Sequence, residues 1–321
     1  SRGLGDVYKR QIFDSPDENN ESVRRLLEVE RPRAAFTSIQ YKLKEIHPPL
    51  LVQMLSAIAE KSRDKAGEYK PDEYYVRLAF QLIDLNPELT VEEKVGLEFT
   101  YIEVLTRPFR GKDQQQIPNL ELYIEEHPEL FVRAVVWTYK RGDGGEDPAE
   151  FRVREGREYL AQGGHRLLEA IERIPGQDQA TKEEQKKKLA DWVATVRRSC
   201  AELDRAEIAD VCLGKLLSNA PTGEDGVWPN EAVRDVMEDL QSENLSRGAH
   251  IGLYNARGVH CRGEGGDQEQ KLADKYRVWA DALQFTHPFV SSSLLMSMVN
   301  TYEREAKQHD TEACIQRPLK H

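Results

Sequence analysis

The sequence predicts an all-α fold, a multi-helix array of antiparallel helix pairs. Apolar residues recur at three- and four-residue spacing along most of the 321 residues, which is typical of amphipathic helices packed on one face. Alternation of the kind found in strands is scarce. Prolines recur where the apolar stripes break, as expected at helix boundaries. These helix-boundary prolines are Pro48, Pro87, Pro128, Pro175, Pro221 and Pro288.

The spacing of these prolines allows two interpretations. The first four intervals are 39, 41, 47 and 46 residues, which matches the unit length of HEAT or armadillo repeats. The strings EIHPPLL, DLNPELT, EEHPELF and FTHPFVS around four of the prolines are also similar. The alternative is that proline marks helix starts in an all-helical protein of any topology, because no side-chain consensus recurs inside the units.

Individual helices can be placed from their starts and stripes. Thr90 with Glu93, and Thr181 with Glu184, fit capping boxes, in which threonine and glutamate satisfy early amide groups reciprocally. Pro71 followed by two acids fits a further helix start. We expect helices over residues 34–46, after Pro49, from Pro71, from Thr90, and over 119–126, 128–140, 155–173, 181–203, 205–218, 229–242, 267–285 and 288–316, the last two forming an antiparallel pair.

A glycine- and aspartate-rich loop over residues 141–151 suggests the domain organisation. Such residues favour turns and loops, so we expect an N-terminal helical subdomain over 12–145 and a C-terminal one over 146–321.

Charge and cysteine usage indicate which partners are disfavoured and in which compartment the protein lies. The formal net charge of -11 disfavours direct binding of nucleic acid, whose phosphates are also negative. The basic run 186–188 lies one turn after Glu183 and Glu184, so we expect i,i+4 pairs on a solvated helix face. No stretch is apolar enough to span a membrane. The four scattered cysteines indicate reduced thiols in a cytoplasmic protein.

One region departs from the helical pattern and is the first place to look for a site. Residues 246–266 hold six glycines, so we expect a glycine-rich loop or a short hairpin there. Long loops in compact domains are often functional. The candidate ligand-binding residues are Arg247, His250, Asn255, Arg257, His260 and Arg262.

Three chemistries compete with a purely structural connection in this region. Glycine amides with Arg257 and Arg262 could bind a phosphate or carboxylate, helped by the start of the following helix. His250, His260 and Cys261 could bind zinc, although no fourth ligand stands at a recognisable spacing. Cys261 with His250 could be a nucleophile and base, although no signature flanks them. We therefore expect no metal and no cofactor, and no catalytic residue can be assigned.

Several strings resemble a known group of proteins. RPRAAFTSIQYKLKEI, SRGAHIGLYNARGVHCRGEGG and KYRVWADALQFTHPFV are similar to the C-terminal region of a group of long uncharacterised bacterial proteins, from about residue 30 onward. Because that group has no established activity, the resemblance implies no residue roles. Residues 1–11, SRGLGDVYKRQ, resemble a translated sequencing-adaptor remnant, and we expect a natural chain that is longer at its N-terminus.

These observations favour a non-enzymatic protein-interaction or scaffolding region of a larger bacterial cytoplasmic protein, with a protein partner. An enzyme, or a nucleotide- or anion-sensing domain centred on residues 246–269, is the first alternative. A regulatory region linked to an upstream DNA-binding module is the second. The oligomeric state is left open by the sequence.

Overall fold

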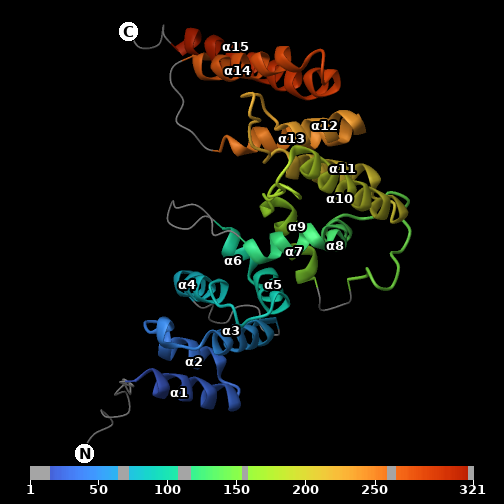
Figure 1. Cartoon of the computed structure of the whole chain (residues 1–321). Coiled ribbons are helices and arrows are strands. Elements are labelled where there is room, and N and C mark those ends of the chain that lie inside the picture. Colours follow the sequence, from blue (N-terminus) through green and yellow to red (C-terminus); the bar gives the residue numbers. More distant parts are fainter. Residues whose placement is uncertain (1–14, 64–71, 108–116, 154–157, 259–264, 317–321) are drawn as a thin grey trace, which may run out of the picture. The chain divides into compact units, whose positions relative to one another are not determined.

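The computed structural model describes residues 15–63, 72–107, 117–153, 158–258 and 265–316 of the chain. Every regular element in these ranges is helical, which confirms the predicted all-α class (Figure 1). The helices form two compact units, residues 1–123 and 124–321. The expected subdomain boundary at residues 145 and 146 lies inside the second unit.

The first unit is built on α3, which packs against α1, α2, α4 and α5. Its elements are α1 (Pro16–Glu28), α2 (Pro32–Ile39), the 3₁₀ turn η1 (Leu43–Glu45), α3 (Pro48–Arg63), α4 (Glu73–Asp84), α5 (Val91–Thr100), α6 (Ile102–Thr106) and α7 (Pro118–Glu126), which contains the boundary between the units.

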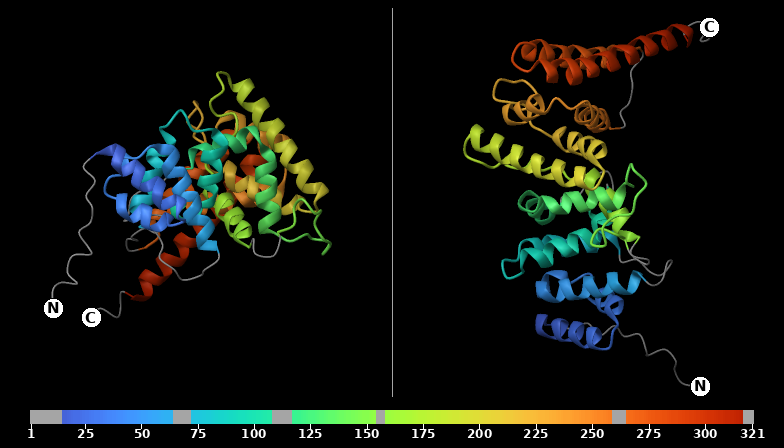
Figure 2. Two further views of the ribbon diagram at one scale, coloured as in Figure 1. Left: turned by 90° about the horizontal axis from the view of Figure 1, so that it is seen from below. Right: turned by 90° about the vertical axis from the view of Figure 1, so that its right-hand side faces the viewer.

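The second unit is built of helix pairs in two layers. Its elements are α8 (Pro128–Thr138), α9 (Tyr159–Ala170), α10 (Lys182–Glu202), α11 (Ala206–Leu217), α12 (Glu231–Leu240), α13 (Glu243–Ala256), α14 (Asp267–Leu283), the π-helical turn η2 (Val290–Leu295) and α15 (Met296–Gln316). One layer runs through α8, α10 and α12, and the other through α9, α11 and α13. The helices α14 and α15 form the predicted antiparallel pair (Figure 2).

The predicted helix starts are present in detail. The Thr90 side chain accepts a hydrogen bond from the Glu93 amide at 3.2 Å, and the Glu93 carboxylate accepts from the Thr90 amide at 2.9 Å. Thr181 and Glu184 make the same reciprocal pair, which confirms both capping boxes. Of the predicted helix-boundary prolines, Pro48 and Pro128 begin α3 and α8, and Pro288 lies two residues before η2. The other three, Pro87, Pro175 and Pro221, lie within the connections between helices.

Three of the similar proline strings share one structural role. In each, an acid stands three residues before the proline and accepts a hydrogen bond from a distant part of the chain. Glu45 accepts from Asn19 at 2.6 Å, and Asp84 accepts from Asn119 at 2.9 Å. Glu125 accepts from Arg173 at 2.7 Å. The turns are therefore alike in contacts as well as in sequence, although the type of repeat stays a prediction.

The expected helix over residues 34–46 is broken. It ends at Ile39 and resumes only as η1, with Lys42 donating back to the Ile39 carbonyl at 2.7 Å. Beyond the break the chain is held by the buried Asn20 of α1, a helix that sequence periodicity did not predict. Its amide group donates to the Glu45 carbonyl at 2.9 Å and accepts from the His47 amide at 2.9 Å, which replaces helical hydrogen bonds.

The expected loop or hairpin at residues 246–266 is wrong for its first half, because α13 continues to Ala256. Gly248 and Gly252 lie on the face of α13 that packs against α11. A β-carbon at Gly248 would lie 2.1 Å from the Val211 carbonyl oxygen. On the facing helix, a β-carbon at Gly214 would lie 2.0 Å from the Leu245 carbonyl oxygen. These glycines permit the two helix backbones to approach closely, which is a packing role.

Carboxylates on neighbouring helices hold the starts of two elements in place. Glu98, with 1% of its surface exposed, accepts from the Leu120 amide at 2.7 Å at the start of α7. Burial raises the pKa of its carboxyl to about 7, although hydrogen bonds from Asn119 and Leu120 oppose the shift. Glu238 accepts from the Phe289 and Val290 amides at the start of η2. Since a helix start carries unpaired amide donors, each carboxylate fixes one element on another.

None of the helices in the described ranges has the length and apolar character needed to cross a membrane.

Candidate groove and the predicted site residues

The predicted site residues on α13 differ in burial and do not form one site. Arg247 and Asn255 are exposed on the helix. His250 is half-buried, with Ser297 at 3.0 Å from its Nδ1 and Thr301 at 3.4 Å from its Nε2. Burial, and to a smaller extent Arg304, lower the pKa of the His250 ring. His250 is therefore held as a neutral link between α13 and α15.

Arg257 is held by carboxylates. Its guanidinium donates to Glu269 at 2.7 Å, lies 3.7 Å from a Glu305 oxygen, and sits 5.6 Å from the centre of the Tyr302 ring. An incoming phosphate would have to displace both acids. The start of α14 is also occupied, because the Gly266 amide donates to Asp310 at 2.9 Å.

Two of the predicted residues, His260 and Arg262, lie outside the described residues, as does Cys261. The zinc and nucleophile hypotheses involve these positions. In the part of the chain that the structure describes, no group of three or more His, Cys, Asp or Glu side chains is arranged to hold a metal ion.

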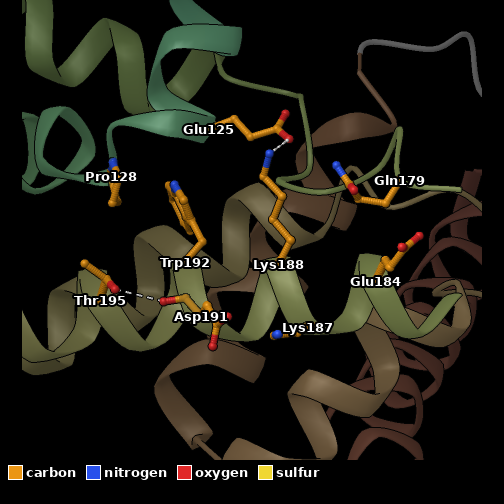
Figure 3. Close-up of a pocket in the computed structure, with 9 residues that line it drawn as sticks. All are labelled: Glu125, Pro128, Gln179, Glu184, Lys187, Lys188, Asp191, Trp192 and Thr195. Atoms are coloured by element: carbon orange, nitrogen blue, oxygen red, sulfur yellow. Dashed lines mark hydrogen bonds and ion pairs between the residues drawn. The ribbon is translucent and has the colours of Figure 1, made fainter. Parts of the chain in front are cut away.

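A groove of about 410 Å³ runs along α10, away from all of these residues (Figure 3). One wall is a face of α10 spanning three turns, and the other is the turn between α7 and α8. A polar side chain from the turn before α10 closes one end. The lining residues are Glu125, Pro128, Gln179, Glu184, Lys187, Lys188, Asp191, Trp192 and Thr195.

The base of the groove is rigid. Trp192 has only 4% of its surface exposed, donates its indole N–H to the Ile124 carbonyl at 2.9 Å, and meets the Phe131 ring edge-on at 5.2 Å. Pro128 begins α8 beside it. These contacts fix the indole and the opposite wall, so the groove has a preformed apolar base.

The upper wall of the groove is an ion-pair network. The Lys188 ammonium lies 2.9 Å from Glu125 and 2.5 Å from Glu126. Burial of Glu125 would raise the pKa of its carboxyl, but hydrogen bonds from Lys188, Arg173 and the Gly176 amide outweigh burial and lower this pKa. The carboxylate therefore stays charged and anchors the groove wall.

Two lysines of the basic run of α10 pair with neighbouring helices, not within their own helix as expected. Lys186 pairs with Asp235 at 3.3 Å and Asp239 at 3.2 Å on α12, and Lys188 pairs with α7. Glu184, the expected partner of Lys188, is used in the capping box. Among the described residues, neither Lys187 nor Asp191 has an ion-pair partner, and both line the groove.

The sequence pattern alone does not reveal this groove. Its local signal is the spacing of Glu184, Lys188, Trp192 and Thr195 on one face of α10, which is that of an ordinary amphipathic helix. The opposite wall comes from a turn about 60 residues earlier, and only the folded structure brings the two together.

Comparison with protein-family models, with curated proteins and with solved structures finds no match for this chain. Its function is therefore inferred from the geometry alone.

Proposed function

We propose that this chain is a non-enzymatic protein-interaction region that holds a peptide segment of a partner protein in the groove of α10. The observation that carries the proposal is the combination of a rigid apolar base, Trp192 and Pro128, with charged groups of both signs that are unpaired among the described residues, Lys187 and Asp191. Aromatic residues and desolvated pockets are where binding energy concentrates in interfaces.

The chemistry of the groove favours a polypeptide over a small anion. Lys187 can bind a carboxylate and Asp191 an ammonium or guanidinium, while the amide of Gln179 can bind a main-chain group. The groove also follows three turns of α10, which suits an elongated ligand.

We further propose that this region acts in the cytoplasm of a bacterial cell, as part of a larger protein, and the free thiols support the reducing compartment. Cys200 and Cys212 are buried free thiols, and burial raises their pKa values to about 12 and about 11. Cys314 is an exposed free thiol, which suits a reducing compartment.

The test is a selection of displayed random peptides against the purified chain, followed by measurement of the affinity of the selected peptides. Lys187→Glu and Thr195→Arg change the groove without removing a core residue, and we expect each to weaken binding by at least about tenfold. Lys307→Glu on α15 is the matched control, because Lys307 is also exposed and lies outside the groove. Failure to select any peptide, or equal binding by the groove variants and the control, would refute the proposal.

A further inference from the structure

Helix α14 carries an exposed stripe opposite its buried residues Ala273, Tyr276 and Ala280. Phe285, just after the helix, is 89% exposed, and Val278 is 66% exposed. At about 100° per residue the stripe covers about one third of the helix circumference. Its members, all exposed, are Lys271, Asp274, Lys275, Val278, Asp281, Ala282 and Phe285.

The charges on the stripe are arranged symmetrically about Val278. Lys275 lies three residues before it and Asp281 three residues after it, while Lys271 and Phe285 lie seven residues before and after. Lys275 lies over the Trp279 ring at 4.6 Å from its centre. Among the described residues, Lys271 and Asp281 have no ion-pair partner.

We propose that α14 of one copy packs antiparallel against α14 of a second copy, on a two-fold axis that passes beside Val278. This pairing places Val278 against its counterpart, Lys275 opposite Asp281, and the Lys271 ammonium over the Phe285 ring. A two-fold interface requires such a self-complementary patch, because each contact is made twice. A cation over an aromatic face adds a further favourable contact.

The same charges disfavour other arrangements. Parallel pairing in register would place lysine against lysine and aspartate against aspartate, which is repulsive. The stripe carries two aspartates as well as two lysines, so it has no net attraction for an anionic membrane surface. Of the two pairings of identical helices, the antiparallel one places unlike charges together over the exposed Val278 and Phe285.

The contact is small, so we expect a reversible dimer and not an obligate one. A single helix face falls at the low end of interface sizes, which is typical of weak association. Sedimentation equilibrium over about 5 to 200 µM is suited to this range, since it measures the dimer Kd directly.

A charge exchange tests the geometry. We expect Phe285→Glu to raise the dimer Kd by at least about tenfold, and Lys275→Glu or Asp281→Lys alone to raise it less. The double variant carrying Lys275→Glu and Asp281→Lys should return the Kd toward the parent value, because the exchanged charges again face each other across the axis. Leu85→Glu is the control, because Leu85 is 82% exposed and directly follows α4 in the other unit.

Three results would overturn the proposal. The first is a parent chain that stays monomeric at the highest concentration. The second is a double variant whose dimer Kd is no lower than that of either single variant. The third is a Leu85→Glu variant that raises the dimer Kd as much as Phe285→Glu does. Circular dichroism of every variant separates a lost contact from a lost fold. The measurement does not involve the groove of α10, so it stands or falls independently of the proposed peptide binding.

Discussion

Replacing Gly248 by alanine tests whether the glycines of α13 serve close helix packing. The added β-carbon would lie 2.1 Å from the Val211 carbonyl oxygen and 2.8 Å from the Val211 carbonyl carbon. Both are backbone atoms of α11, so no side-chain rotation can relieve the contact. The two helices would have to separate by about 1 Å, which would loosen a densely packed contact.

The expected magnitude follows from two opposing effects. Overpacking a close contact costs about 1 to 3 kcal/mol and sometimes more, and this contact involves two backbones. Alanine gains up to about 1 kcal/mol over glycine inside a helix. Taking the upper end of the overpacking range, we expect Gly248→Ala to lower the free energy of unfolding by about 2 kcal/mol net.

The chain provides matched controls for this substitution. Gly96 lies inside α5, where an added β-carbon would have no heavy atom within 4 Å, so Gly96→Ala should stabilise by about 0.5 to 1 kcal/mol. Gly252→Ala should be intermediate, because its nearest contact is the Ser218 hydroxyl, a side-chain atom that can rotate.

Denaturant unfolding measures these differences. All four tryptophans lie in residues 124–321, so their fluorescence reports on the unit that contains Gly248, while far-UV circular dichroism reports on both units. If Gly248→Ala is as stable as the parent, or more stable as expected for Gly96→Ala, the close approach of α11 and α13 is wrong.

Three further predictions concern polar groups. The pKa of Glu98 is raised to about 7 in the fold, so the native state binds more protons than the unfolded state between pH 4.5 and 7. The free energy of unfolding therefore falls by up to about 3 kcal/mol as pH rises through this window. Glu98→Gln should remove this part of the pH dependence, as measured by urea unfolding followed by circular dichroism. Thr181→Ala should destabilise by about 1 kcal/mol through loss of the capping box, whereas Thr311→Ala, which removes a hydroxyl bonded only within α15, should change the fluorescence-detected midpoint little. Arg205→Met should destabilise by about 3 kcal/mol, because it leaves the Tyr139 and Leu203 carbonyls and the Asp147 carboxylate without their buried donor, and an unchanged unfolding midpoint would contradict this.

Local signals in the sequence were sufficient for most helix starts. Thr90 and Thr181 satisfy amides within their own first turns, so their roles follow from neighbouring residues alone. The apolar stripes likewise predict which faces are buried, because helical periodicity is a local property.

Signals that depend on distant residues were misread or missed. Glycine both interrupts helices and permits close packing, and at Gly248 the choice is decided by Val211, 37 positions earlier. The turn at Glu45 and His47 is held by Asn20, and the groove beside Trp192 is formed by the turn that holds Glu125 and Pro128. None of these partners can be identified from spacing along the chain.

The acid that stands three residues before Pro48, Pro87 and Pro128 has a consequence for how such a chain can change. At Glu45, Asp84 and Glu125 the acceptor stays a carboxylate, while the donor is an asparagine in two cases and an arginine in the third. The donors also stand at different sequence distances, 26, 35 and 48 residues away. The carboxylate acceptor is thus constant, while the donor side chain and its distance along the chain vary. We infer that the segment between acceptor and donor can change in length while the two helices stay joined by the same hydrogen bond.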